Sequence, residues 1–148
     1  KAHLEDVEKS YDLFCSGVIE GLRMLGIDAY NRKGDIIIVG KKVSGSAQHR
    51  LYDVILHHGT LMVDVNLDML GRTLGVSDPE RRLINLHDVL PSKVPLNKIK
   101  RAINVGFEKR FNVKPKRGTL TSRERRIAKR LCEIKYSKRD WNEDVYFI

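Results

Sequence analysis

Apolar residues recur at steps of three and four along the start of the chain, a spacing that predicts an amphipathic helix over residues 4–25. The apolar positions of this predicted helix are Leu4, Val7, Tyr11, Phe14, Val18, Leu22 and Leu25. Gly26 is expected to end it. Gly17 and Gly21 lie inside it, and each costs about 1 kcal/mol of helix stability relative to alanine. We therefore expect another element to pack closely against these two glycines.

The next stretch, residues 27–65, is predicted to be mostly β-structure with short, hairpin-like connections. Asp28–Tyr30 indicates a short strand, and residues 31–34 have the composition of a turn. The run Asp35–Gly40 is β-branched without polar alternation, which favours a strand buried on both faces. Residues 41–47 are small and polar after two lysines, and Asp53–Val65 predicts one strand or two.

The remainder of the chain is predicted to be mostly helical. The expected helices are Leu67–Leu74, Arg81–Leu90, a strongly amphipathic one from Leu96 to Phe111, and one that follows Thr121. Thr121 and Glu124 fit a capping box at the start of the last helix. Val113–Leu120 is predicted as a strand. Because no repeat or linker composition is present, we expect one α/β domain over residues 1–148.

Composition adds a strong asymmetry of charge. The formal net charge is +9, yet residues 1–92 carry 11 Lys/Arg against 13 Asp/Glu, whereas residues 93–139 carry 17 against 3. Such a basic block attracts nucleic acid, nucleotide phosphates or an acidic protein, or it is simply a solvated helical surface. With 41% apolar and 32% charged residues, the chain is typical of a folded, soluble domain.

Two further observations bear on the compartment. No apolar run approaches the roughly 18 residues that a membrane span needs, and we see no secretory leader. Cys15 and Cys132 lie far apart and form no CxxC pair, which argues against a disulfide framework and a thiolate zinc cluster. We therefore expect a reduced, cytoplasmic protein without a membrane partner.

Several short motifs carry the chemistry. Asp35 opens a strand, GKKVSGSAQ follows at residues 40–48, and HHGTL at residues 57–61. RLINL at residues 82–86 precedes Leu90-Pro91, and KYS and DWN occur at residues 135–137 and 140–142. In this order and spacing, the motifs closely resemble the signature of the lipoate–protein ligase family, which shares its fold with biotin–protein ligases.

The resemblance implies a mixed, largely antiparallel sheet flanked by helices. It extends over the whole chain, but only to the second half of the family's catalytic domain. The N-terminal arginine- and glycine-rich half and the small accessory domain have no counterpart in residues 1–148. We therefore expect a second chain to supply the rest of the pocket, because half a sheet leaves an exposed edge.

The activity that the resemblance implies is ATP-dependent activation of lipoate to lipoyl-AMP, followed by transfer to a lysine of a lipoyl-carrier domain. The carrier would be an E2 subunit of a 2-oxoacid dehydrogenase or the H protein of the glycine-cleavage system. Lys42 would be the catalytic residue, because a cation offsets the repulsion between a carboxylate and the α-phosphate. Asp35 would hold Mg²⁺, which favours carboxylate oxygen. The other implied substrate- and nucleotide-binding residues are Val43, Ser44, Gly45, Ser46, Ala47, His57, His58, Gly59, Arg82 and Asn85.

Plainer interpretations stand beside these roles. Lys41 and Lys42 could be two solvated charges, of which we expect Lys41 to point the other way. Asp35 could be a turn residue, and Gly34 stands where the family usually has asparagine. Arg82 and Asn85 could simply start a helix.

Histidine and cysteine also invite more than one interpretation. Adjacent strand residues face opposite sides, so His57 and His58 cannot easily chelate one ion, and packing or a hydrogen bond to the pocket wall is expected instead. Cys15 and Cys132 are expected to be small, buried apolar residues.

Two other functions remain open. A sister family of octanoyl- and lipoyl-transferases shares the fold and the lysine but uses a cysteine nucleophile, which in the nearest such relatives falls at about Ile27. The basic last third could instead make a nucleic-acid-binding module, although no stacking platform accompanies the charge.

Overall fold

The computed structural model describes residues 5–143, which divide into two compact units with the boundary between Pro115 and Lys116. Each unit is described by itself. The boundary falls inside the stretch 113–120, which the sequence predicted to be a strand. That prediction was wrong: residues 113–121 have no regular secondary structure. Pro115 lacks a backbone N–H for a ladder and Gly118 contributes no side chain to packing, so this stretch makes a poor strand.

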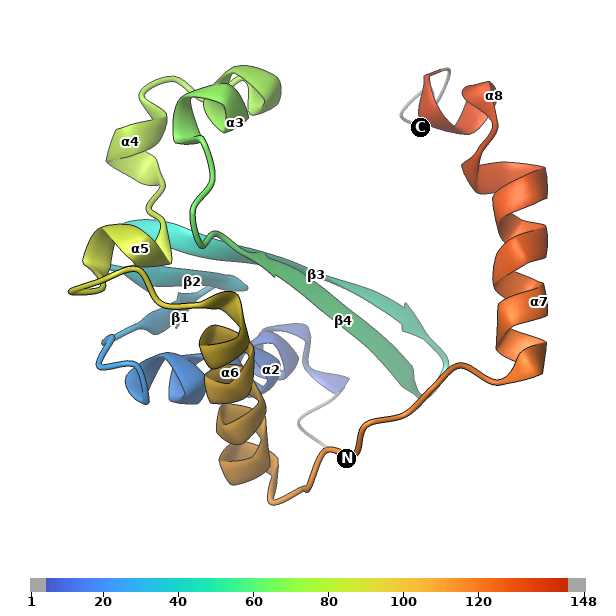
Figure 1. Ribbon diagram of the computed structural model, residues 1–148, viewed down its shortest axis with the longest axis horizontal. Helices are drawn as coiled ribbons and strands as arrows, with labels where there is room; N and C mark the ends of the chain where they lie inside the picture. Colours follow the sequence, from blue (N-terminus) through green and yellow to red (C-terminus); the bar gives the residue numbers. More distant parts are fainter. Residues whose placement is uncertain (1–4, 144–148) are drawn as a thin grey trace. The chain divides into compact units, whose positions relative to one another are not determined.

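The first unit is built on one antiparallel sheet in which the strands follow chain order (Figure 1). The strands are β1 (Tyr30–Arg32), β2 (Asp35–Ile38), β3 (Lys41–Leu51) and β4 (Val54–Leu61). The antiparallel sheet flanked by helices confirms the predicted fold class. Residues 41–47, which carried no strand pattern, form the first half of β3. Pairing with β2 and β4 on its two sides stabilises this small, polar segment as a strand.

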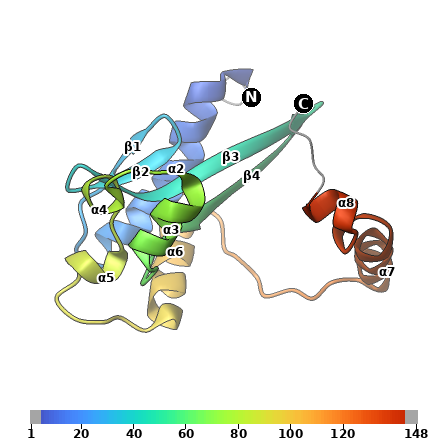
Figure 2. The same cartoon turned by 90° about the horizontal axis from the view of Figure 1, so that it is seen from above.

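Two long helices, α2 (Val7–Arg23) and α6 (Leu96–Phe111), lie side by side against one face of the sheet (Figures 1 and 2). The core between them and the sheet joins Cys15 and Leu22 of α2, Ile99 of α6, and Ile36 and Ile38 of β2. Ile37 is also fully buried although it points to the opposite face. This confirms the expectation that β2 is buried on both sides.

The close approach expected at Gly17 and Gly21 occurs against α6. A Cβ atom at Gly21 would lie 2.7 Å from the Cα of Ile103, and one at Gly106 would overlap the backbone of Gly17 and Gly21. Three glycines therefore let the two helices touch backbone to backbone.

Three short helices follow β4: α3 (Leu67–Leu74), α4 (Pro79–Arg82) and α5 (Leu86–Val89). Helices α3 and α4 lie on the other side of the sheet from α2 (Figure 1), whereas Leu86 of α5 belongs to the core with α2 and α6. The single helix predicted over 81–90 was wrong, because residues 83–85 are extended. The N–H of Ile84 donates to the carbonyl of Lys42 at 3.0 Å, and Leu83 forms a parallel bridge with Lys42. Backbone pairing with β3 thus overrides the helical preference of this segment.

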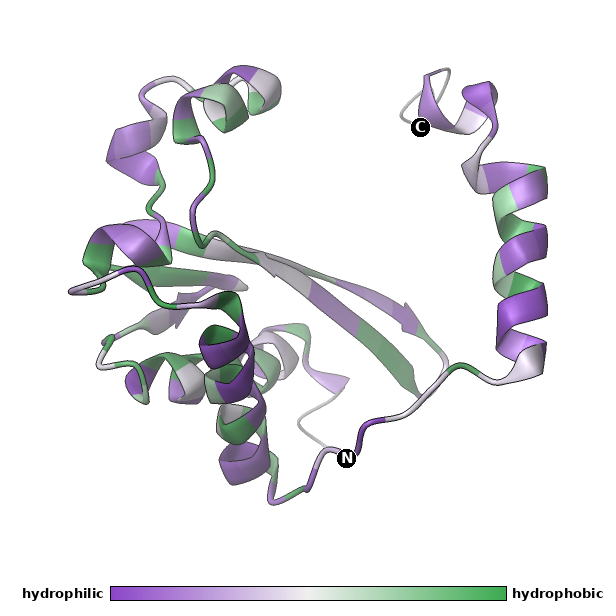
Figure 3. Cartoon of the chain, in the orientation of Figure 1, coloured by the Kyte–Doolittle hydropathy of each residue, from purple (hydrophilic) through white to green (hydrophobic). Residues whose placement is uncertain are grey.

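The second unit contains α7 (Ser122–Leu131), a π-helical turn (Cys132–Tyr136) and α8 (Arg139–Asn142). The predicted capping box is present, since the Thr121 hydroxyl accepts from the Glu124 N–H and the Thr121 N–H donates to the Glu124 carboxylate. The π-helical turn brings the Lys135 ammonium to 4.0 Å from the centre of the Trp141 ring. Figure 3 shows hydrophilic residues prevailing along α7, interrupted by a few apolar positions.

Cys132 was expected to be buried, and this was wrong: it is exposed, whereas Cys15 is buried as expected. The second unit is a single row of short helices without a core of its own, so it offers Cys132 nothing to pack against. Among the helices of residues 5–143, none combines the length and the apolar character that crossing a membrane requires.

Candidate active site

A row of residues on one face of the sheet forms the floor of the candidate site. Strand register aligns Arg32 of β1 with Asp35 of β2, Asp35 with Gly45 of β3, and Gly45 with Thr60 of β4. Cross-strand partners point to the same face of a sheet, so these four positions face the same side. Helix α2 covers the opposite side, whereas residues of α3 and α4 border the cavity on this face.

Lys42 lies three residues before Gly45 in β3, and its side chain extends toward this row. The pairing skips Val43 between Ile36 and Ile37, so the fully buried Val43 is a bulge in β3 that turns Lys42 to the same face as Gly45. A Cβ atom at Gly45 would lie only 2.9 Å from Cε and 3.0 Å from Nζ of Lys42. The lysine stem therefore lies over Gly45, in space that any larger residue would occupy.

The Lys42 ammonium forms an ion pair with Asp35, with 2.8 Å between Nζ and Oδ1. Both side chains keep about a third of their surface exposed, at 37% and 32%. The strand backbone at Lys42 is fixed on two sides, by Ile37 of β2 and by the bridge to Leu83. The backbone is therefore fixed, Asp35 holds the ammonium, and the exposed part of the side chain is accessible to an anionic substrate.

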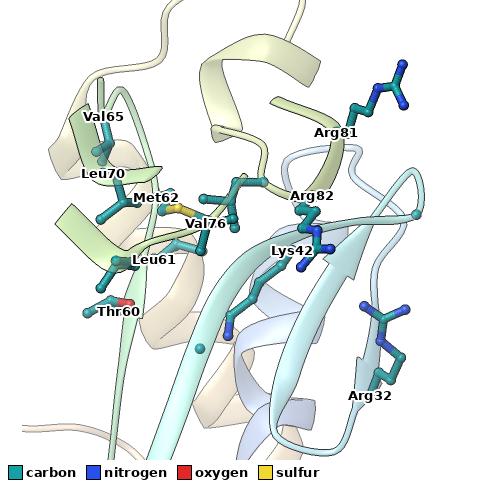
Figure 4. Close-up of a pocket in the computed structure, with 14 residues that line it drawn as sticks. Arg32, Lys42, Thr60, Leu61, Met62, Val65, Leu70, Val76, Arg81 and Arg82 are labelled. Carbon is teal, nitrogen blue, oxygen red and sulfur yellow. The ribbon is translucent and has the colours of Figure 1, made fainter. Parts of the chain in front are cut away.

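Lys42 lies in the middle of a cavity of about 760 Å³ that has two chemically distinct ends (Figure 4). Its apolar end consists of side chains of β4, of α3 and of the segments around them: Leu61, Met62, Val65, Leu70, Leu74 and Val76. Arg32 and Arg82 line the other end, with Gly40 beside them. Arg81 also borders the cavity but points away from it in Figure 4. An elongated ligand with one apolar and one anionic end fits this arrangement.

A smaller hollow of about 290 Å³ continues from Lys42 along the β3–β4 hairpin. Asp35, Ala47, His58 and Gly59 line it together with Ser46. A Cβ atom at Gly59 would lie 3.0 Å from the Gly45 carbonyl oxygen, so the strands approach closely here. Most of the residues implied by the GKKVSGSAQ and HHGTL motifs therefore gather around one ammonium group.

Other predicted site residues have their side chains on the opposite face of the sheet. The Ser46 hydroxyl donates to the Gly34 carbonyl at 2.5 Å. His57 stacks on Phe14 with 5.0 Å between ring centres and lies 3.2 Å from the Gln48 amide nitrogen. The two histidines thus face opposite sides, as strand geometry predicts. Burial lowers the pKa of His57, with a smaller contribution from His58, so the ring is neutral near pH 7.

Cys15 of α2 also lies on the face of the sheet opposite the cavity, with its sulfur 3.8 Å from both the Gly34 carbonyl oxygen and the Ser46 hydroxyl. Burial raises the pKa of this thiol, which keeps it protonated. It is not among the residues that line either hollow at Lys42. A thiolate nucleophile needs the opposite conditions, namely exposure and a lowered pKa.

Asn85 and Ser44 are buried, and the Asn85 side chain forms hydrogen bonds with the backbone of Val65. Its amide oxygen accepts from the Val65 N–H at 2.9 Å, and its amide nitrogen donates to the Val65 carbonyl at 3.0 Å. Asn85 also precedes α5 as its cap, in line with the plainer interpretation of this residue. Asn85 therefore ties the segment that follows β4 to the segment that pairs with Lys42, while Arg82 lines the cavity itself.

Asp35 is the acidic residue of this face that could hold a metal ion. No group of three or more His, Cys, Asp or Glu side chains suited to a metal occurs within residues 5–143. Mg²⁺ bound with nucleotides is commonly held by one or two carboxylates together with phosphate oxygens and water. A single carboxylate beside a cationic cavity fits that mode, so Asp35 could provide one ligand to a magnesium ion that arrives with a nucleotide.

Sequence reasoning did not identify Arg32 or the apolar end of the cavity. Arg32 lies in a segment that reads as a turn, and only the strand register shows that it shares a face with Asp35. Leu70 and Val76 are apolar residues of a kind that usually fills a core. No local pattern distinguishes them from core residues.

The comparisons with known proteins agree with this geometry. Residues 1–108 match the family model described as the lipoyl protein ligase A/B catalytic domain. The chain therefore belongs to the lipoyl protein ligase A/B family.

Individual relatives include both ligases and transferases. An octanoyltransferase LipM of Geobacillus kaustophilus is 27% identical, with 92% of this chain and 61% of the relative aligned. A crystal structure of lipoate–protein ligase A bound with ATP superposes with a TM-score of 0.85 at 28% identity, covering 93% of this chain and 59% of that one. A bipartite lipoate protein ligase, described with its E2 lipoyl domain from Thermoplasma acidophilum, gives 0.85 at 26% identity, covering 97% and 60%. The chain thus spans about three fifths of the length of these relatives.

Proposed function

We propose that the chain takes part in ATP-dependent lipoylation, in which lipoate is activated as lipoyl-AMP and then transferred to a lysine of a carrier domain. The observation that carries this proposal is the position of the Lys42 ammonium, which lies over Gly45 in a cavity with one apolar and one cationic end. A lipoate–protein ligase of the same fold binds ATP, which supports a nucleotide as one substrate.

In the first step, a carboxylate oxygen of lipoate attacks the α-phosphorus of ATP. The bond between that phosphorus and the oxygen bridging to the β-phosphate breaks, and pyrophosphate leaves. Two anions must approach each other, and negative charge builds on the phosphoryl oxygens. Lys42 offsets this charge because Asp35 already holds its ammonium in the cavity before the substrates bind.

In the second step, the ε-amine of the carrier lysine attacks the carbonyl carbon of lipoyl-AMP. The bond from this carbon to the phosphate oxygen breaks, AMP leaves, and the amine nitrogen loses a proton as the amide forms. Lys42 donates a hydrogen bond to the departing phosphate or to the carbonyl oxygen, which draws electrons away from the carbon under attack. Mg²⁺, held in part by Asp35, would neutralise phosphate charge.

Two protein partners belong to this proposal. A second chain would supply the remainder of the pocket, and a similar structure is that of a bipartite lipoate protein ligase from Thermoplasma acidophilum. The acylated partner would be a lipoyl domain, of an E2 subunit or an H protein. We place the reaction in the cytoplasm, where ATP is available and Cys15 and Cys132 stay reduced.

Transfer of an octanoyl group from a thioester is the second candidate, because octanoyltransferases are among the relatives. A ligase is the better supported of the two. Ile27, at about the position of the transferase cysteine, is 5% exposed and belongs to the core. The buried Cys15 thiol, with its raised pKa, makes a poor nucleophile.

Intact-mass measurement of a lipoyl domain tests the proposal. The domain is incubated with this chain, lipoate and Mg-ATP, with and without a candidate second chain. We expect one lipoyl group per domain, dependent on both ATP and lipoate. Acylation from an octanoyl thioester without ATP would instead identify a transferase.

A further inference from the structure

One end of the large cavity holds positive charge that no carboxylate of the described chain compensates. Lys42 is paired with Asp35 at 2.8 Å, so that carboxylate is already matched by one cation. Arg32 and Arg82 line the same cavity, and the ion pairs found among residues 5–143 include neither of them. Both arginines are exposed, so water stabilises them without a carboxylate partner and a ligand can reach them. Two guanidinium groups at one end of a cavity attract an anion, and this indicates an anionic ligand.

The two arginines come from separate elements that the fold brings together. Arg32 ends β1, and the register places it beside Asp35 on the ligand face of the sheet. Arg82 ends α4, immediately before the segment that bridges to Lys42. In Figure 4 both guanidinium groups lie on the side of Lys42 that faces away from Leu70 and Val76.

Resting on the proposed function, we propose that Arg32 and Arg82 form a pyrophosphate subsite that binds the β- and γ-phosphates of ATP and holds pyrophosphate after the first step. If the α-phosphate lies at the Lys42 ammonium, the remaining phosphates need further cations on one side of it. The apolar end offers them none, whereas the arginine end offers two planar groups that bind phosphate oxygens in pairs. The charge of these groups stabilises the leaving group as the bond to the α-phosphorus breaks.

Direct binding of inorganic pyrophosphate, measured by titration calorimetry, tests the subsite without requiring turnover. We expect Arg32→Gln to weaken pyrophosphate binding about tenfold or more, as loss of a charge-assisted contact predicts. AMP affinity should stay within about twofold of the original, because the α-phosphate contacts Lys42. Lys33→Gln is the matched control, since Lys33 carries the same charge one residue away, is exposed and does not line the cavity.

Three outcomes would overturn the subsite. These are unchanged pyrophosphate affinity in Arg32→Gln, an equal loss in Lys33→Gln, and no pyrophosphate binding by the unmodified chain. The proposed function is judged separately, by the ATP-dependent mass gain of the lipoyl domain. Arg32-dependent pyrophosphate binding without that mass gain would support the subsite and contradict the ligase.

Discussion

At the residue scale, the site depends on one side chain that needs its neighbours to be small. Lys42 lies over Gly45 and contacts Asp35, and its backbone is fixed by Leu83. The motif around Lys42 predicted this chemistry from the sequence, because small residues and a lysine occur there in a fixed order. It could not reveal that Ser46 points away from the face that carries Lys42, since that depends on the bulge at Val43.

A second residue-scale feature is the turn between β2 and β3. Val39 and Gly40 both have positive φ, at 49° and 76°, and Val39 is 79% exposed. Two-residue hairpins of this type favour asparagine followed by glycine. A β-branched residue in the left-handed region is strained by about 1–2 kcal/mol.

We therefore expect Val39→Asn to raise the free energy of unfolding by about 1 kcal/mol. Val39→Thr is the matched control, because threonine is polar but keeps the branch at Cβ and should gain nothing. Denaturant unfolding of the two variants distinguishes relief of strain from removal of an exposed apolar group. Equal stability of the Asn and Thr variants would rule out backbone strain as the cause.

At the element scale, α2 and α6 cross each other and pack against the face of the sheet opposite the cavity. Gly17 and Gly21 predicted a close neighbour from the sequence. Glycine lowers the stability of a helix, so two glycines on one helix indicate that another element packs closely there. The identity of that neighbour was not predictable, since the matching Gly106 lies more than eighty residues further along the chain.

A methyl group at position 106 should force the two helices apart. We expect Gly106→Ala to lower the free energy of unfolding by about 3 kcal/mol, at the upper end of overpacking costs, because the new atom would meet backbone rather than a flexible side chain. Gly118→Ala serves as the control, since a Cβ atom there meets nothing within 4 Å. Denaturant unfolding followed by circular dichroism compares them; a Gly106→Ala variant as stable as Gly118→Ala would refute the packing argument.

Other elements show where local pattern fails. The sequence predicted α3 at its observed limits because both the apolar spacing and the final glycine are local signals. It missed the first part of β3, where small polar residues and a bulge hide the strand pattern. It also missed the extended residues 83–85, which pair with the distant Lys42. Helical preference in such segments is weaker than the gain from satisfying backbone groups.

At the scale of the whole molecule, the strands and loops around Lys42 belong to a sheet with an open edge. Within the described residues, β4 pairs with β3 alone, which leaves its other edge available for a further strand. An exposed edge of eight residues favours association with another chain. This agrees with the proposed second chain. The positive charge of residues 93–139 would favour an acidic carrier domain as the other proposed partner.

The central claim is that the Lys42 ammonium activates the acyl phosphate, and paired lysine variants test it most directly. The measurement is the rate of lipoyl-AMP formation by Lys42→Met and Lys41→Met, each with the same partner chain. Lys41 is the matched control because it borders a different hollow, with Asn66 and Asp88. We predict a loss of about 100-fold or more for Lys42→Met, by analogy with removal of one transition-state donor, and a near-normal rate for Lys41→Met. A near-normal rate for Lys42→Met, or an equal loss in Lys41→Met, would contradict the account.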